Sequence, residues 1–218
     1  MSLTLVAVPI GNTDDITIRA LKTLQEADLV VGEERKPLFR LFKQLQIDRP
    51  KDFRLLNEHS SKEDIRELCQ LCATQNVALV TDCGTPGFSD PGAELVALCR
   101  KKTISITSNP GASSLTTFLS LCGVRLESFD FRGFLPREAE KRELAIKALN
   151  RASQPTIIMD TPYRLHKTLQ QLAALLTDKK VTLAMDLTKE SEWVLTGTPP
   201  EVLKMFDGSK REFLILIH

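Results

Sequence analysis

The stretch Val80-Thr-Asp-Cys-Gly-Thr-Pro-Gly-Phe-Ser-Asp-Pro-Gly92 decides how the rest of the chain is interpreted. It follows an apolar run, 77–80, that is typical of a buried strand, and it holds three glycines and two prolines before helical spacing resumes over 93–100. In open α/β sheets, ligands bind beyond the carboxyl ends of strands, where glycines admit backbone N–H groups close to the ligand. The stretch also fits a rigid connecting loop, but two further loops of the same design favour ligand binding.

The composition indicates a globular protein. Hydrophobic residues make up 42% of the 218 residues and charged residues 26%, which argues against disordered and fibrous classes. The net charge of +1 argues against binding of nucleic acid by bulk charge, although a local basic patch remains compatible with it. No apolar run approaches the roughly 18 residues that span a membrane, and the N-terminus lacks the pattern of a signal peptide. We therefore expect a cytoplasmic protein without membrane contact.

The five cysteines predict neither a disulfide framework nor a metal site. Cys69 and Cys72 form a C-x-x-C pair, but the pair lies in a helix predicted over 62–74, where this spacing places both side chains on one face. No second cysteine pair or nearby histidines complete a zinc site. We expect these cysteines to pack as small apolar side chains.

Strand-like and helical segments alternate regularly through the first half of the chain. Asp14 and Asp15 are expected near the N-terminal end of the first helix. The alternation predicts parallel strands joined by helices, which collects the strand ends at one edge of a sheet. The predicted strands are 3–8, 29–31, 53–56, 77–80 and 103–107. Three of the predicted helices are 16–27, 62–74 and 93–100. A further helix is predicted to open with the charged residues 32–36 and to carry apolar positions as far as residue 45.

The second half has a different rhythm, and short links between its last strands predict a mixed sheet. The turn-rich stretch 108–114 between the halves is the expected domain boundary and a second ligand loop. We therefore predict two α/β lobes, residues 1–108 and 109–218. The predicted strands of the second lobe are 129–132, 156–159, 181–185, 193–195 and 213–217, and its helices are 137–150, 163–176 and one that begins at Pro199 and Pro200.

Three loops, Pro9-Ile-Gly-Asn12, 81–92 and Asn109-Pro-Gly-Ala-Ser-Ser114, together resemble those of the tetrapyrrole methylase superfamily of S-adenosylmethionine-dependent methyltransferases. Within that superfamily, the chain is similar to the bacterial small-subunit ribosomal RNA cytidine 2′-O-methyltransferase family. The likeness covers nearly all of the chain in colinear order. Its other motifs are Asp15-Ile-Thr-Ile-Arg-Ala-Leu21, Gly133-Phe-Leu-Pro-Arg137, Thr161-Pro-Tyr-Arg-Leu165 and Leu187-Thr-Lys189.

The resemblance implies a bilobal α/β methylase that works as a homodimer and holds S-adenosylmethionine in a cleft between its lobes. A carboxylate or carbonyl groups suit the ammonium of this cofactor, and Gly-rich turns at helix starts supply N–H groups to its carboxylate. Carried over by position, the first lobe contributes Pro9, Asp82, Cys83, Gly84, Gly87 and Phe88, and the second contributes Ser113, Ser114, Asp160, Pro162, Leu187 and Thr188.

The resemblance also implies methyl transfer to a ribose 2′-hydroxyl of small-subunit ribosomal RNA, either as free RNA or in the assembled subunit. The sulfonium is already an activated leaving group, so the reaction needs alignment and removal of the hydroxyl proton but no metal. The acid/base candidates that follow strand ends are Glu33, Glu34, Glu58 and His59, and the residues expected to hold flanking phosphates are Arg35, Lys36 and Arg40. This charged cluster also fits a solvated helix start.

Departures from the family pattern bear on the acceptor. The family typically reads AEDTRHTRKLL after the second strand, whereas this chain reads Gly32-Glu-Glu-Arg-Lys-Pro-Leu-Phe-Arg-Leu-Phe42, and of the family's HEHNE only Glu58 and His59 are kept. Two alternatives therefore stay open. One is a methyltransferase for a small molecule such as a tetrapyrrole, which the near-neutral net charge favours. The other is a non-catalytic cofactor-binding module, which the altered charged loop favours.

Overall fold

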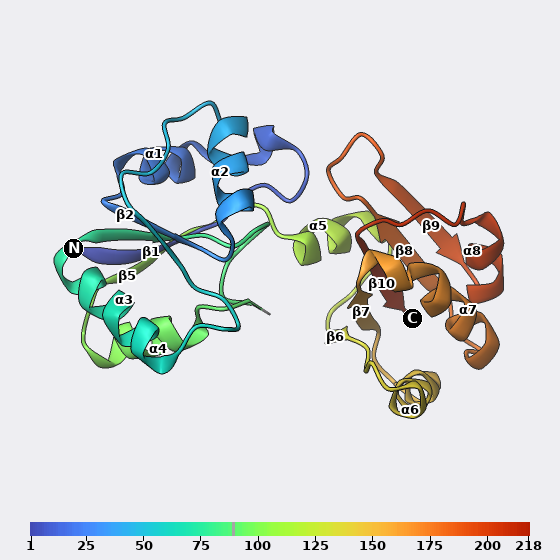
Figure 1. The fold of residues 1–218 in the computed structure, drawn as a ribbon. Helices are drawn as coiled ribbons and strands as arrows, with labels where there is room; N and C mark the ends of the chain where they lie inside the picture. The colour runs from blue at the N-terminus through green and yellow to red at the C-terminus, as the bar shows by residue number, and fades with distance from the viewer. Residues whose placement is uncertain (89) are drawn as a thin grey trace. The chain divides into compact units, whose positions relative to one another are not determined.

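The computed structural model describes residues 1–88 and 90–218, so Ser89 of the central loop lies outside the described residues. The described residues form two compact units, Met1–Ser114 and Leu115–His218, each an α/β unit built on a five-stranded sheet (Figure 1). The division comes after Ser114 and not after residue 108. The reason is that β5 (Ile106–Asn109) belongs to the first sheet, and a boundary at 108 would cut this strand.

The sheet of the N-terminal unit is parallel throughout, in the order β3-β2-β4-β1-β5, as the alternation of strands and helices predicts. Parallel strands of this kind are covered on both faces, which explains their nearly continuous apolar sequences. Besides β5, the strands are β1 (Ser2–Val6), β2 (Leu29–Gly32), β3 (Phe53–Leu55) and β4 (Asn76–Leu79), and the helices are α1 (Ile18–Glu26), α2 (Arg35–Gln44), α3 (Lys62–Thr74) and α4 (Ala93–Lys101).

Two apolar cores lie on opposite faces of this sheet, because successive strand residues point to opposite sides. Leu29 and Val31 of β2 pack with residues of α3 and α4, whereas Val30 packs with residues of α1 and α2. Figure 1 shows the two helix pairs on the two sides of the sheet. Cys69 and Cys72 are buried free cysteines in the α3 and α4 core, which confirms their expected packing role.

Capping side chains set where the helices begin. Thr17 accepts a hydrogen bond from the Ala20 N–H at 3.1 Å, so α1 begins at Ile18. Asp14 and Asp15 lie close to this end of α1, as expected, in a separate 3₁₀ turn, η1 (Thr13–Asp15). The predicted helix began two residues earlier, at residue 16, because the apolar spacing continues through both segments, while the Thr17 cap separates them.

The sheet of the C-terminal unit is mixed, in the order β6-β7-β10-β8-β9, with β6 and β7 parallel and the other pairs antiparallel. The last strand in sequence, β10, is thus central. Among the described residues, no helix is both long and apolar enough to cross a membrane. The strands are β6 (Asp130–Phe134), β7 (Thr156–Asp160), β8 (Val181–Met185), β9 (Trp193–Gly197) and β10 (Phe213–Ile217), and the helices are α6 (Ala139–Asn150), η2 (Pro162–Arg164), α7 (Leu165–Leu175) and α8 (Pro199–Met205), with α5 (Ser114–Leu121) before them.

Candidate active site

The three predicted ligand loops meet within the N-terminal unit. The first and central loops join where Val8 and Gly84 exchange backbone hydrogen bonds of 2.9 and 3.1 Å. The central loop reaches the third where the Thr85 hydroxyl donates to the Ala112 carbonyl at 2.9 Å. All three loops follow the carboxyl ends of parallel strands, which lie at one edge of the sheet. Together with these hydrogen bonds, that placement joins the three loops into one loop cluster.

Glycines permit the close approach of these loops. A Cβ added to Gly84 would lie 3.2 Å from the Ile10 side chain, and the φ of +81° is one that other residues rarely adopt. A Cβ added to Gly111 would lie 3.0 Å from the Ala7 Cβ. The cluster is therefore a close-packed cradle, in which the missing side chains of Gly84 and Gly111 let the loops approach one another.

The predicted cofactor residues of this unit are placed on the loop cluster. Pro9 is half-buried, whereas Asp82, Cys83 and Phe88 are exposed, as is Gly87 with its φ of +90°. Ser113 and Ser114 were predicted in the second lobe, but they belong to the N-terminal unit. Their loop follows β5 and is bonded to the central loop, which is why it folds with the first sheet.

Carboxylates gather where β2 and β4 end. One oxygen of Glu33, Oε1, accepts hydrogen bonds from the Thr81 hydroxyl and, at 3.1 Å, from the Asp82 N–H. Partial burial of the Asp82 carboxyl, together with the charges of Glu33 and Glu34, raises its pKa to about 6. Burial and the charges of Glu33 and Asp82 likewise raise the pKa of Asp90 to about 6. These two carboxyls exchange protons close to neutral pH.

Two of the predicted acid/base candidates, Glu33 and Glu58, line one pocket of about 570 Å³, a size suited to a small ligand. The Asn57 side chain ties the end of β3 to that of β2 by donating to the Glu33 carbonyl at 3.2 Å. Glu34 is exposed at the start of α2. The pocket lining comprises Glu33, Leu56, Asn57, Glu58, Ser60, Ile65, Asp90, Pro91, Gly92, Ala93, Glu94 and Leu95.

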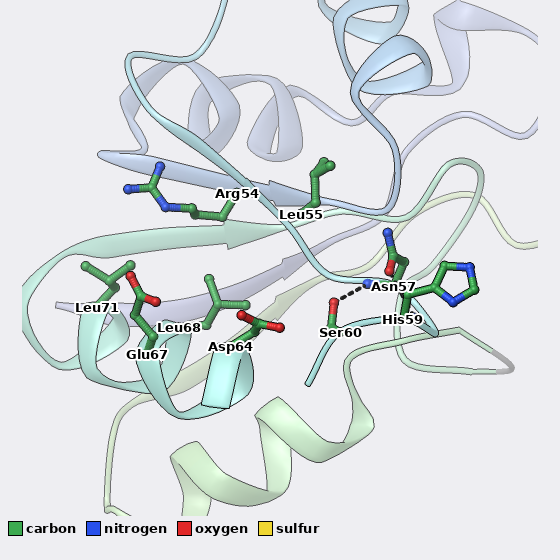
Figure 2. Close-up of a pocket in the computed structure, with 9 residues that line it drawn as sticks. All are labelled: Arg54, Leu55, Asn57, His59, Ser60, Asp64, Glu67, Leu68 and Leu71. Atoms are coloured by element: carbon green, nitrogen blue, oxygen red, sulfur yellow. Dashed lines mark hydrogen bonds between the residues drawn. The ribbon is translucent and has the colours of Figure 1, made fainter. Parts of the chain in front are cut away.

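His59 lines the adjoining pocket between β3 and α3 (Figure 2). Its backbone N–H donates to the Asn57 side chain at 3.0 Å, while its imidazole is 85% exposed and lies 3.7 Å from the Glu58 carboxylate. The Asn57 N–H donates to the Ser60 hydroxyl at 2.9 Å, which closes this turn. Of the four candidates, Glu33 and Glu58 therefore line one pocket, while His59 lines the adjoining pocket and stays beside Glu58.

Three residues at this site were not singled out by sequence reasoning. Asp90 has a pKa raised to about 6. Thr81 donates a hydrogen bond to the Glu33 carboxylate, and Asn57 joins the ends of β2 and β3. Asp90 and Thr81 carried a signal, since both belong to the central stretch. Asn57 begins the polar run that supplied Glu58 and His59.

The C-terminal unit places its predicted cofactor residues after neighbouring strand ends. Asp160 of β7 and Met185 of β8 both pair with Phe213 of β10, so Pro162 and Leu187 follow adjacent strand ends. Leu187 is largely buried. Thr188 has a φ of +64°, and its N–H donates to the Glu192 carboxylate at 2.7 Å, which fixes the turn.

The Asp160 carboxylate is engaged inside the unit. It lies 2.6 Å from Arg142 Nη1 and accepts from the Thr161 N–H at 2.8 Å, and its side chain is 1% exposed. Arg142 also donates to Thr168 at 2.5 Å and to Gln171 at 2.7 Å. Because its carboxylate is engaged, Asp160 would contact a ligand only through its backbone groups. Among the described residues, no group of three or more His, Cys, Asp or Glu side chains is placed to hold a metal ion.

The sequence matches known proteins over almost its whole length. The family of tetrapyrrole (corrin/porphyrin) methylases matches residues 2–203. Proteins named ribosomal RNA small subunit methyltransferase I are similar to this chain. The protein of Thermotoga maritima is 36% identical over 95% of this chain and 93% of its own length. The protein of Synechocystis is 37% identical over 99% of this chain and 78% of its own length.

Solved structures share the fold. A diphthine synthase has a TM-score of 0.79 at 17% identity, covering 100% of this chain and 89% of its own. A uroporphyrin III C-methyl transferase from Thermus thermophilus has a TM-score of 0.67 at 16% identity, covering 100% and 97%. The expected bilobal α/β methylase fold is thus confirmed.

Proposed function

The chain belongs to the tetrapyrrole (corrin/porphyrin) methylase family, and we propose that it methylates a ribose 2′-hydroxyl of small-subunit ribosomal RNA. It is an S-adenosylmethionine-dependent methyltransferase. The observation that supports the acceptor is the similarity, at 36% identity over 95% of the chain, to a protein named for the small ribosomal subunit RNA. The proposal of a ribose oxygen rests on the family motifs in the sequence.

The loop cluster fits S-adenosylmethionine on its own chemistry. Asp82 offers a carboxylate to the ammonium, and the glycine-rich loop that the Val8–Gly84 bridge holds in place offers further backbone groups beside it. We propose cofactor contacts at Pro9, Asp82, Cys83, Gly84, Gly87, Phe88, Ser113 and Ser114 in the N-terminal unit, and at Asp160, Pro162, Leu187 and Thr188 in the C-terminal unit. When bound, S-adenosylmethionine supplies a methyl group activated by the sulfonium charge.

The protein's own part in the reaction is alignment and proton removal. As the acceptor oxygen bonds to the methyl carbon and the carbon–sulfur bond breaks, the hydroxyl proton passes to a carboxylate. We propose Glu33 or Glu58 for this role because both line the same pocket. The Oε1 atom of Glu33 is held by Thr81 and Asp82, which fixes the carboxylate and leaves Oε2 to take the proton. Glu34 and His59 are proposed as further acid/base candidates beside them.

The test is transfer of a labelled methyl group from S-adenosylmethionine to small ribosomal subunits and to naked ribosomal RNA, both from cells lacking this protein. We expect label on a ribose 2′-oxygen. Absence of label, in a preparation that binds the cofactor by calorimetry, would contradict the RNA acceptor and favour a small molecule or a non-catalytic binding module.

We also propose a homodimer that works in the cytoplasm, as the family resemblance implies. Sedimentation equilibrium measures the oligomeric state directly. A monomer at micromolar concentration, with cofactor present and activity retained, would contradict the dimer.

A further inference from the structure

Basic side chains are concentrated in residues 35–54, which we call the basic segment. It comprises α2, the connection 45–52 and β3 at the edge of the N-terminal sheet. It holds seven of the 29 Lys and Arg residues but two of the 28 Asp and Glu residues, so its net charge is +5. Because the whole chain has a net charge of +1, the rest carries −4. The charge distribution is therefore strongly asymmetric, and all seven basic residues are exposed.

Almost none of this charge is neutralised within the protein. Among the described residues, only Arg54 of the seven forms an ion pair, with Asp52 at 2.7 Å. In the part of the chain that the structure describes, the other six form no ion pair with a carboxylate, and their like charges repel one another. A bound polyanion would relieve that repulsion and release its own counterions.

Aromatic rings hold two of the guanidinium groups in place. The Cζ atoms of Arg35 and Arg49 lie 5.4 and 5.0 Å from the centroid of the half-buried Phe39 ring. Arg35 also lies 5.5 Å from Phe53, which packs edge-on against Phe39. Stacking of this kind orients the planar guanidinium, and within the described residues neither guanidinium has a hydrogen-bond acceptor. Their N–H groups are free for a planar or tetrahedral oxyanion.

Three further basic residues form a line along α2. Lys36, Arg40 and Lys43 are spaced i, i+4 and i+7, so they share one exposed face. At 1.5 Å per residue, this line extends for about 10 Å. Since α2 begins two residues after Glu33, which lines the pocket, the line starts beside the proposed acceptor site.

We propose that the basic segment binds the phosphates that flank the acceptor nucleotide in RNA. Arg35 and Arg49 are fixed contacts, and the α2 line contacts successive phosphates further along the strand. The inference rests on the proposed function, because it takes RNA as the acceptor. A membrane surface fits less well: interfacial segments expose large apolar side chains beside their basic ones, and among the described residues of α2, the connection and β3 only Leu55 exposes a large apolar side chain, at 40%.

The experiment compares two double variants that remove equal charge. Arg35→Gln with Arg49→Gln alters the basic segment, whereas Arg100→Gln with Lys101→Gln alters α4 on the opposite face of the same sheet (Figure 1). Binding of a small-subunit ribosomal RNA fragment is measured by fluorescence anisotropy between 50 and 200 mM salt. We expect the slope of log affinity against log salt to become less negative by about 1.4–1.8 in the first variant only, since each contact contributes about 0.7–0.9.

The outcomes separate this surface from the proposed function. A raised KM for RNA with kcat and cofactor affinity retained, in the first variant only, supports the surface. Equal salt slopes in both variants would overturn it even if the wild type methylates RNA. If the wild type binds anionic phospholipid vesicles but not RNA, both proposals are overturned.

Discussion

Val8 and Gly84 exchange two backbone hydrogen bonds, 2.9 and 3.1 Å long, in an isolated antiparallel bridge outside the sheets. The bridge joins the loop after β1 to the loop after β4. At its centre, Gly84 has a φ of +81°, and a Cβ added there would lie only 3.2 Å from the Ile10 side chain. The shape of the proposed cofactor cradle therefore depends on a residue without a side chain.

We expect Gly84→Ala to lower stability by about 1–2 kcal/mol, because a left-handed backbone is unfavourable for alanine. It should also weaken cofactor binding by about tenfold or more, equivalent to about 1.4 kcal/mol. Gly208→Ala is the matched control, since its φ is +79° and nothing lies within 4 Å of the added Cβ. Urea unfolding and calorimetry measure the two effects. Equal cofactor affinity in both variants would contradict the cradle.

Glu33→Gln should keep cofactor affinity within a few-fold while lowering kcat by about 10²–10⁴, the usual range for loss of a general base. The amide oxygen can still accept from Thr81 and Asp82, so the loop stays in place. Glu58→Gln is measured in parallel to decide between the two carboxylates. Glu94→Gln, which lines the same pocket, is the control. Full transfer rates in both of the first two variants would exclude them as bases.

Cofactor affinity should rise between about pH 5 and pH 7. The pKa of Asp82 is raised to about 6 by burial and by Glu33 and Glu34, so its carboxyl is half protonated at that pH. Only the carboxylate attracts an ammonium, so binding should release a proton. Calorimetry in buffers of different ionisation enthalpy counts that proton. An affinity independent of pH, or one equally dependent on pH in Asp82→Asn, argues against this contact.

Stability of the N-terminal unit should fall as the pH rises from about 4 to about 6. Asp90 has its pKa raised to about 6, above the 3.9 of an unfolded aspartate, so the folded state binds its proton more tightly. That contribution is complete below about pH 4 and is lost as the pH passes 6. Asp90→Asn should reduce the dependence and leave the part that Asp82 contributes through its own raised pKa, whereas Asp48→Asn removes the same charge at an exposed site. Urea midpoints across this range measure it.

Arg142→Met should destabilise the C-terminal unit by about 3 kcal/mol, because it leaves the buried Asp160 carboxylate with only the Thr161 N–H and the more distant Arg164 guanidinium, 3.6 Å away. Adding Asp160→Asn should recover part of the loss. Arg151→Met, an exposed position at the end of α6, is the control. Denaturant unfolding of the wild type, of the single variants Arg142→Met and Asp160→Asn, and of the double variant gives the coupling energy. If the losses of unfolding free energy in the two single variants add up to the loss in the double variant, Arg142 and Asp160 are not coupled.

The order of elements was predictable because each carries a local signal. β1, β2 and β4 are buried on both faces, so their apolar runs stand out, and Pro199 begins α8 as expected of a first-turn proline. Strand neighbours within each sheet were not predictable in detail. The place of β10 between β7 and β8 depends on contacts between residues far apart in the sequence.

The site was predictable to the level of loops but not of side-chain partners. Pattern located the loops that carry Glu33, Glu58 and Asp82, because parallel strands end at one edge. It did not reveal that Thr81 holds Glu33, nor that Asp160 faces Arg142 in the interior, since both depend on tertiary packing. The Phe39 contact with Arg49 was hidden for the same reason.

The central position of β10 has a consequence for biosynthesis. β7 and β8 each pair with β10 and not with each other, so until residues 213–217 have emerged from the ribosome the sheet exists only as the separate pairs β6–β7 and β8–β9. The N-terminal sheet has no such dependence, because its strands are complete by Asn109. The first unit can therefore fold during translation, while the second must wait for its last strand, with two unpaired edges exposed in the interval.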